Sequence, residues 1–330
     1  MLQTTQSPAT NYQTNVYDSI FDMLPNEQNP SPMVRLNRLN PSTTFPLYAK
    51  LEWANPFGSL KDRAAWFMLR DLEEREQVGP DRSMVEPTSG NTGISLAALA
   101  GARGYSVRTV VPNGIPMEKK VLLKICGALL DVVSDELCPA PGLGEGSINL
   151  AKTYARAHGD QYVMPNQYEN TQNVRAHLET TGPEIWRQTD GQITHLFVSL
   201  GTCGTVTGTG RFLKEKNPRI KVIAVQPSEG HDVPGLRNLR QLEVSKLFDR
   251  ELIDEILEID YRLAYRRALD LCRHEGLLAG PSSGLVFEGA QRVVERDKEG
   301  LGVMIFADNI FKYVSNMIRH IPELAEGITA

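Results

Sequence analysis

A lysine stands at the start of a predicted helix, directly after a turn. Pro56 and Gly58 mark the turn. Ser59 is suited to cap the helix, so that Lys61 would lie in its first turn. The positive end of a helix disfavours an ammonium group, and we therefore expect the pKa of Lys61 to be lowered. A lysine that loses its proton easily is the group that Schiff-base chemistry requires. An ordinary exposed lysine in a charged run is the alternative interpretation.

A second polar segment precedes an apolar helix predicted over residues 94–100. It reads Glu86-Pro87-Thr88-Ser89-Gly90-Asn91-Thr92-Gly93. Hydroxyl groups and backbone amides gathered at the start of a helix bind carboxylates and phosphates. A helix cap alone would need one Ser or Thr. We therefore interpret the segment as an anion site.

Two further segments of small residues lead into predicted helices. The first is Gly201-Thr202-Cys203-Gly204-Thr205, after a predicted strand. It departs from the dinucleotide pattern GxGxxG because Cys203 replaces the second glycine, and it lacks the GK[ST] ending of a nucleotide-binding P-loop. It is interpreted as a phosphate cup of another kind, with a merely flexible loop as the alternative. The second, residues 279–284 around Ser282, is ambiguous by itself because Gly-Pro-Ser clusters are common turns.

The elements that must position these segments alternate along the chain. Apolar runs rich in β-branched residues predict strands at 107–112, 196–200, 222–225 and 303–306, and helical periods lie between them, as at 117–126 and 262–274. This alternation predicts an α/β fold with largely parallel sheets covered by helices on both faces. Ligands in such folds bind where strand ends meet helix starts.

Two lobes are expected from 330 residues of this pattern. We place one at 47–164, carrying Lys61 and the Ser-Gly-Asn-Thr-Gly loop. The other comprises 1–46 and 165–330 and carries the phosphate cup and Ser282.

Composition excludes several classes of partner. The chain has 35 basic and 40 acidic residues, a net charge of −5, and no basic block, which argues against nucleic acid and anionic membranes. Its start has neither a basic nor an apolar run, so no signal peptide is predicted, and no apolar stretch is long enough to span a membrane. The four cysteines show no CxxC spacing, so neither a disulfide framework nor a metal site is predicted. We expect a soluble, cytoplasmic protein.

Taken together and in this order, the four segments resemble those of the fold type II pyridoxal-phosphate enzymes, whose architecture is that of the tryptophan synthase β subunit. The resemblance covers residues 31–315 and is strongest to the cysteine synthase and cystathionine β-synthase branch, because serine and threonine dehydratases typically carry Gly-Asn-His instead of Ser-Gly-Asn-Thr-Gly. The segment 177–184 also looks like that branch. Two positions depart from it: Phe57, more often threonine, and Cys203, more often glycine.

The resemblance implies a role for each segment. Lys61 would form the Schiff base with pyridoxal 5′-phosphate, Asn91 would bond its phenolic oxygen, and Ser282 would face its pyridine nitrogen. The phosphate would be held by Gly201, Thr202, Cys203, Gly204 and Thr205. The carboxylate of an amino-acid substrate would be bound by Thr88, Ser89, Thr92 and Gln167.

The implied reaction is a β-replacement that makes cysteine. A neutral serine cannot protonate the pyridine nitrogen, so the cofactor is a weaker electron sink and loss of a β leaving group is favoured. Lys61 is the natural general base. O-acetylserine or O-phosphoserine would give an aminoacrylate, which takes up sulfide or thiosulfate. A homodimer is implied by the resemblance as well.

The leaving group stays open. Residues 230–238 resemble the loop of phosphoserine-using sulfhydrylases in which an arginine grips the substrate phosphate. Arg237 suits a phosphate dianion because its planar fork forms two charge-assisted bonds, with a surface arginine as the alternative. Other enzymes of this fold share the first half-reaction, namely cystathionine β-synthase, diaminopropionate-type synthases and cysteine lyases. A non-catalytic cofactor-binding protein is a further alternative.

Overall fold

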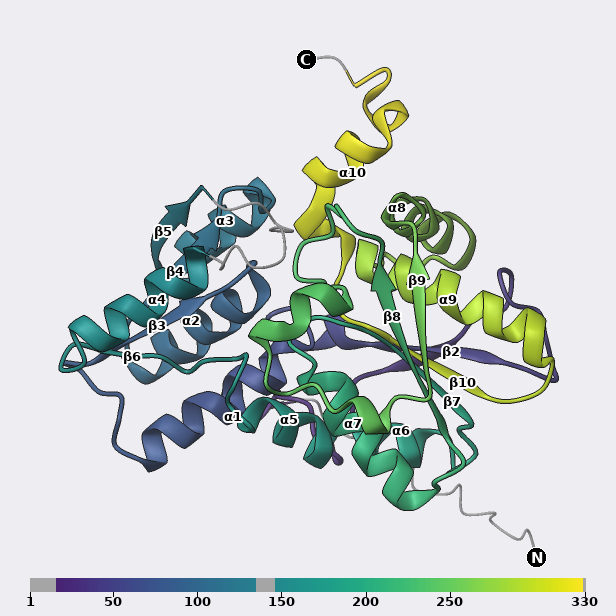
Figure 1. The fold of residues 1–330 in the computed structure, drawn as a ribbon, viewed down its shortest axis with the longest axis horizontal. Coiled ribbons are helices and arrows are strands. Elements are labelled where there is room, and N and C mark those ends of the chain that lie inside the picture. The colour runs from purple at the N-terminus through teal and green to yellow at the C-terminus, as the bar shows by residue number, and fades with distance from the viewer. Residues whose placement is uncertain (1–15, 135–145, 329–330) are drawn as a thin grey trace, which may run out of the picture.

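The computed structural model describes residues 16–134 and 146–328, whose strands form two sheets (Figure 1). The larger sheet has the order β1-β2-β10-β7-β8-β9 and is parallel except for the β1–β2 pair. Its strands are β1 (Met33–Arg35), β2 (Leu47–Leu51), β7 (His195–Ser199), β8 (Lys221–Pro227), β9 (Glu255–Ile259) and β10 (Gly302–Phe306).

The smaller sheet is parallel throughout and has the order β5-β4-β3-β6. Its strands are β3 (Ser83–Pro87), β4 (Val107–Pro112), β5 (Leu129–Val133) and β6 (Tyr162–Val163). All four predicted strands are present within two residues of their expected bounds, and the α/β architecture is confirmed. The two lobes with boundaries at 47 and 164 stay a prediction. Strand β2, which begins at residue 47, pairs within the larger sheet.

Helices flank both sheets (Figure 1). They are α1 (Lys61–Glu74), α2 (Asn91–Arg103), α3 (Met117–Ile125), α4 (Gly146–Ala157), α5 (Gln172–Ala176), α6 (Gly182–Gln188), α7 (Gly204–Lys216), α8 (Tyr261–Asp270), α9 (Pro281–Asp297) and α10 (Val314–His320). The helix predicted over 262–274 is α8 followed by a π-helical turn, Leu271–Glu275. No helix among the described residues combines the length and the apolar character needed to cross a bilayer.

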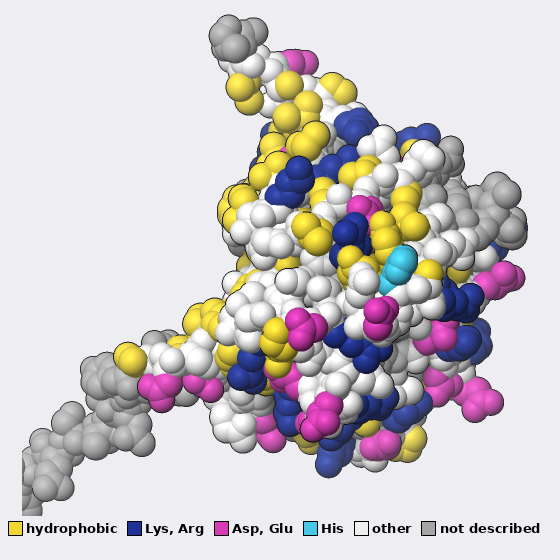
Figure 2. Space-filling model, turned by 90° about the vertical axis from the view of Figure 1, so that its left-hand side faces the viewer, with side chains coloured by type: hydrophobic (Ala, Val, Ile, Leu, Met, Phe, Trp, Pro, Cys, Tyr) yellow, Lys and Arg dark blue, Asp and Glu magenta, His cyan; other side chains and the backbone are white. Residues whose placement is uncertain are grey.

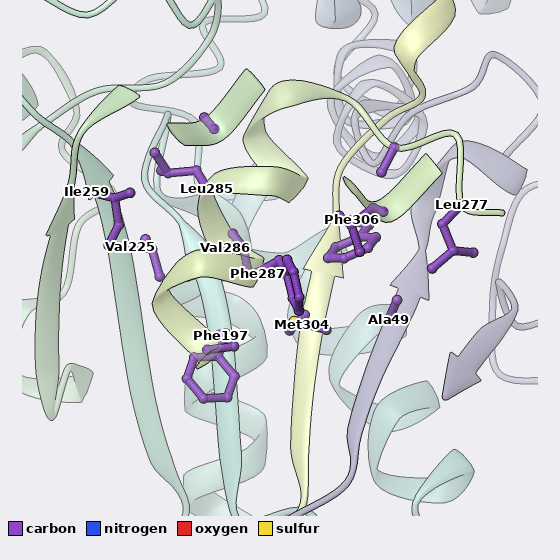
Figure 3. Packing of buried hydrophobic residues seen from close by; sticks show 14 of the residues in the cluster. Ala49, Phe197, Val225, Ile259, Leu277, Leu285, Val286, Phe287, Met304 and Phe306 are labelled. Carbon is purple, nitrogen blue, oxygen red and sulfur yellow. The ribbon is translucent and has the colours of Figure 1, made fainter. Parts of the chain in front are cut away.

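The central strands β7 and β10 of the larger sheet are buried on both faces. Alternate residues of a strand point to opposite sides of the sheet. Phe197 of β7 and Met304 of β10 belong to the core beneath α8 and α9. Their neighbours Leu196 and Val303 belong to the core on the other side, with residues of α6 and α7. Figure 3 shows Phe287 of α9 directed at the strands of the sheet. This double burial explains why the strands are nearly continuous apolar runs.

Each of the four polar segments contains the start of a helix. The helix predicted over 94–100 begins three residues earlier than expected, within the polar segment. Helices α1, α2, α7 and α9 begin at Lys61, Asn91, Gly204 and Pro281. The expected cap of α1 is displaced by one residue. Leu60 is the cap, and Ser59 instead accepts a hydrogen bond of 3.2 Å on its hydroxyl from the backbone amide of Lys61.

Candidate active site

One pocket gathers the side chains that the four polar segments supply. The predicted site residues that line it are Lys61, Thr88, Ser89, Asn91, Thr92, Gln167, Gly201, Thr202, Cys203, Thr205, Arg237 and Ser282. Gly204, the remaining one, begins α7 between two lining residues. The lining has five further polar residues to which the sequence analysis assigned no role in the site, which are Ser147, Tyr168, Ser199, Asp308 and Tyr313.

The amine of Lys61 lies at the centre of these groups. Its Nζ donates a hydrogen bond of 3.2 Å to the hydroxyl of Thr202, from the predicted phosphate cup. Burial lowers the pKa of Lys61 to about 8, against the opposing influence of Cys203 and Glu86. The expected lowering is therefore present, with loss of hydration as its main cause.

The hydroxyl of Thr202 is held from a second side. The side-chain amide of Asn173, in α5, donates to it at 3.0 Å and also donates to the backbone carbonyl of Gln167 at 2.8 Å. Two donors already point at Thr202 Oγ1, so its own proton is directed away from both of them. Thr202 and Asn173 thus join the lysine to the turn at Gln167.

The turn from Gly201 to Thr205 is packed closely against neighbouring protein atoms. A Cβ on Gly201 would come 2.7 Å from the carbonyl oxygen of Gly235, and one on Gly204 would come 2.2 Å from Asn173 Oδ1. Cys203 adopts φ 66°, a left-handed conformation that favours glycine. The first amides of α7 have no acceptor within the helix. Small residues and free amides at a helix start fit a phosphate group.

Thr205 is oriented from behind by a buried imidazole. Nε2 of His177 lies 3.1 Å from Thr205 Oγ1, and its Nδ1 lies 2.9 Å from Thr181 Oγ1. Burial, together with the charges of Arg63 and Lys61, lowers the pKa of His177 to about 3. The imidazole is therefore neutral near pH 7 and carries one N–H. His177 and Thr181 come from the segment 177–184 noted in the sequence.

The loop before α2 is tied to the turn around Gln167. The hydroxyl of Thr92 donates to Gln167 Oε1 at 2.6 Å, and Gln167 Nε2 donates to the carbonyl of Pro87 at 2.8 Å. The buried carboxylate of Glu86 accepts the backbone amides of Asn166 and Gln167 at 2.8 and 3.0 Å. Burial raises the pKa of Glu86 to about 7 despite these bonds.

Arg237 reaches the pocket from the loop that follows β8. One guanidinium nitrogen donates to the hydroxyl of Tyr168 at 3.0 Å, and the guanidinium carbon lies 5.0 Å from the centre of the same ring. The side chain is almost completely buried. It is thus no surface arginine. Ser89 contacts the same loop, since a Cβ on Gly235 would lie 3.0 Å from its hydroxyl.

The sequence matches one protein family and is similar to cysteine synthases. The family described as "Pyridoxal-phosphate dependent enzyme" matches residues 24–308. Cysteine synthase B of Escherichia coli strain K12 is 38% identical over 285 residues, which cover 86% of this chain and 92% of that protein.

Two solved structures share the fold nearly end to end. O-ureido-L-serine synthase has a TM-score of 0.83 at 30% identity and covers 93% of this chain and 96% of its own. A hydrogen sulfide-producing enzyme from Fusobacterium nucleatum has a TM-score of 0.83 at 28% identity, with 91% and 100% covered.

The residues of the pocket fit pyridoxal phosphate. Gly201, Thr202, Cys203 and Thr205 line the pocket directly before or at the start of α7, where the first backbone amides of the helix can bind a phosphate. An amine with a pKa of about 8 lies beside it, at the distance of one hydrogen bond from Thr202. This chain belongs to the family of pyridoxal-phosphate dependent enzymes.

Proposed function

We propose that the enzyme makes cysteine by β-replacement of an activated serine with a sulfur nucleophile. The observation that carries the proposal is the pocket itself, in which the amine of Lys61 lies between a phosphate cup and a loop of hydroxyl and amide groups. The similarity to cysteine synthase B of Escherichia coli supports this choice among the reactions of the family.

Three groups would hold the cofactor. The turn 201–205 would bind its phosphate, Lys61 its aldehyde carbon, and Asn91 and Ser282 the polar atoms of its ring. When bound, pyridoxal phosphate supplies an electron sink that weakens the bonds at the α-carbon of an amino acid. Ser282, uncharged and in the first turn of α9, leaves that sink weaker than an aspartate would.

Lys61 would also move the proton. Its pKa of about 8 leaves part of the amine neutral near pH 7, as a general base requires. Nζ would take the α-proton while the β leaving group departs. It would return that proton after the sulfur has bonded to the β-carbon.

The substrate carboxylate would be bound by the loop before α2. Thr88 accepts the amides of Gly90 and Gly93 on its hydroxyl at 3.0 and 3.3 Å, which leaves its own proton for another acceptor. Ser89, Thr92 and Gln167 complete this side of the pocket. The hydroxyl proton of Thr92 is used by Gln167, so Thr92 would act by fixing that side chain. The donors to the carboxylate would be the hydroxyls of Thr88 and Ser89 and the second N–H of the Gln167 amide.

The test of cofactor attachment is reduction of the coloured protein with borohydride, followed by peptide mapping. The label should lie on Lys61 and be absent from the Lys61→Ala variant. Turnover assays would then pair O-acetylserine, O-phosphoserine and cysteine with sulfide and with thiosulfate. A label on another lysine, or cysteine formed from no serine derivative, would contradict the proposal.

A lyase reaction that releases sulfide from cysteine is the second candidate function. The similar structures include a hydrogen sulfide-producing enzyme and O-ureido-L-serine synthase. Loss of a β substituent from cysteine would use the same groups of this pocket as loss of one from an activated serine. Release of sulfide from cysteine alone, faster than cysteine synthesis, would favour a lyase.

We propose that Arg237 makes phosphate the preferred leaving group. It lines the pocket on the loop that contacts Ser89, and a guanidinium binds a phosphate dianion through two charge-assisted bonds. Arg237→Ala should lower kcat/KM for O-phosphoserine about 10- to 100-fold, the equivalent of one strong bond of this kind. The value for O-acetylserine should change little.

Arg240 provides the matched control for this test. It lies three residues further along and pairs with Glu229 at the surface, where its side chain is 69% exposed. Arg240→Ala should leave both donors unaffected. Equal turnover of phosphoserine in the parent and in Arg237→Ala would remove the phosphate role.

We also propose that the enzyme is a cytoplasmic homodimer. Met117, Val121 and Ile125 form an exposed apolar row along α3, at a spacing of four residues. Glu118 of this helix accepts two bonds of 2.7 Å from Ser315, which joins it to α10. Figure 2 shows hydrophobic side chains gathered along the projecting C-terminal segment. A second copy of the chain would cover this surface. The cytoplasm is proposed because the thiols of Cys126 and Cys272 are free, which suits a reducing compartment.

The dimer is tested by light scattering of the parent and of Val121→Glu. The variant should be a monomer, and a monomeric parent would contradict the proposal. Lys124→Glu, in the same helix, is the control for added charge.

A further inference from the structure

A completely buried carboxylate lies beside the pocket without a role in the reaction proposed above. Asp308 follows β10 and lines the pocket. Its backbone forms a bridge with Ser59, just before α1, and its carbonyl accepts the amide of Gly280, just before α9, at 2.9 Å. Asp308 therefore lies where two of the helix starts of the site meet.

The side chain of Asp308 holds Asn91. Oδ2 accepts a bond of 2.7 Å from the side-chain amide of Asn91 and another of 2.7 Å from the hydroxyl of Tyr313. Oδ1 has no hydrogen-bond partner among the described residues. A Cβ on Gly280 would come 2.4 Å from it, so glycine there leaves the carboxylate its room.

Asn91 is held from its other end by a cation. Nζ of Lys312 lies 3.3 Å from Asn91 Oδ1 and also donates to the carbonyls of Phe57 and Gly58 at 3.0 and 2.9 Å. An ammonium only donates, and a carboxylate only accepts. The reversed amide would place NH₂ against the ammonium and C=O against the carboxylate. Asp308 and Lys312 together therefore permit one orientation of Asn91.

We infer that Asp308 is a positioning residue that makes Asn91 present an N–H, rather than its carbonyl, to the cofactor. One hydrogen of the amide is used by Asp308, and the second is left for an acceptor in the pocket. The phenolic oxygen of pyridoxal phosphate is such an acceptor. This inference rests on the proposed role of Asn91.

The position of the carboxylate is itself fixed from the far side. Lys119 of α3 donates to the hydroxyl of Tyr313 at 2.8 Å, and Tyr313 in turn donates to Asp308. Lys119 is buried beneath the loop before α2, where a Cβ on Gly90 would come 2.5 Å from its Cδ. The hydrogen-bonded chain Lys119–Tyr313–Asp308–Asn91 thus connects α3 to the start of α2.

The experiment is a double-mutant cycle on the cofactor site. The variants are Asp308→Ala, Asn91→Ala and both together, each freed of cofactor and titrated with pyridoxal phosphate while its visible band is recorded. Asp308→Ala should weaken binding about 5- to 20-fold and shift the band, as Asn91→Ala does. The double variant should be no worse than Asn91→Ala, because Asp308 acts through Asn91.

Two further variants separate positioning from structural support. Glu118→Ala removes both bonds to Ser315, which are another anchor of the C-terminal segment. It should leave the affinity within about twofold of the parent and the band unchanged. Asp308→Asn keeps the shape and supplies the test if the alanine variant does not fold, as judged by thermal unfolding. It should show the same direction of change, because its neutral amide lets Asn91 reverse.

The outcomes are distinct. If Asn91→Ala changes affinity and band but neither variant at 308 does, positioning by Asp308 is wrong and the role of Asn91 stands. If the losses of affinity from the two single substitutions multiply in the double variant, positioning by Asp308 is also wrong, because the two residues then act independently. If Asn91→Ala itself changes nothing, the role of Asn91 and this inference fall together.

Discussion

Thr92 and Gln167 are separated by 75 residues in the chain and joined by a hydrogen bond of 2.6 Å. Gln167 then donates to the carbonyl of Pro87 at the end of β3, before the loop that leads to Thr92 in α2. The loop before α2 and the turn after β6 are thereby one unit. A carboxylate bound by either segment is positioned by both.

Thr92→Val removes this link while keeping the shape of the side chain. The KM for the amino-acid donor should rise about tenfold, the equivalent of one hydrogen bond, and the cofactor band should stay unchanged. Steady-state kinetics and absorption spectra check this. Thr153→Val, on the exposed face of α4, is the control, because its hydroxyl bonds only the carbonyl of Asn149. A changed band with an unchanged KM would place Thr92 at the cofactor instead.

Gly204→Ala disturbs the start of α7, whose first amides would bind the phosphate. Its Cβ would come 2.2 Å from Asn173 Oδ1, so the start of α7 or Asn173 has to move. The variant should lose most of its bound cofactor on dialysis, measured by absorbance. Gly101→Ala in α2 is the control, because nothing lies within 4 Å of its Cβ. That variant should retain the cofactor and unfold at the same or a slightly higher temperature.

The reactivity of Lys61 in the cofactor-free protein should follow its lowered pKa. Its neutral fraction increases as the pH rises through about 8, compared with 10.5 for an ordinary lysine. Between these values the unfolded chain holds a proton that the folded protein has lost, so folding becomes more favourable with pH there.

Labelling with a limiting amount of an amine-reactive anhydride, read by mass spectrometry of the Lys61 peptide, measures this directly. The midpoint should lie near pH 8 in the folded protein and near pH 10 in urea. Equal profiles in the two states would show that burial has no effect on the amine.

A buried ion network stabilises the elements behind Lys61. Arg63 bonds Glu52 at 2.8 Å and Glu184 at 2.5 Å, and Glu184 also accepts Lys50 at 2.6 Å, with all four side chains inaccessible to solvent. Glu184→Gln leaves two buried cations with one carboxylate. The free energy of unfolding in urea should fall by about 3–5 kcal/mol.

The exposed pair of Arg70 and Glu74 gives the control for this measurement. Their side chains are 53% and 64% exposed, and Glu74→Gln should cost less than about 1 kcal/mol. Equal losses for the two variants would mean that burial adds nothing to the ion network.

Local chemistry in the chain was enough to predict most of the fold and the segments of the site. The strands at 107–112 and 303–306 were readable because both of their faces are buried, which leaves a continuous apolar run. Lys61 and Asn91 were readable because each begins a helix directly after a polar turn. Both signals, the apolar run and the polar turn before a helix, are local in the sequence.

Only the tertiary structure decided which distant groups meet. Asp308 lies 217 residues from the amide that it holds, and Arg63 lies 121 residues from Glu184. No periodicity or turn signal relates such pairs, because their distance is set by how the sheets and helices pack. The sequence by itself identified the chemical groups of this site. Their hydrogen-bond partners were decided by the tertiary structure, because buried charges and amides must bond to whichever groups the packing brings within reach.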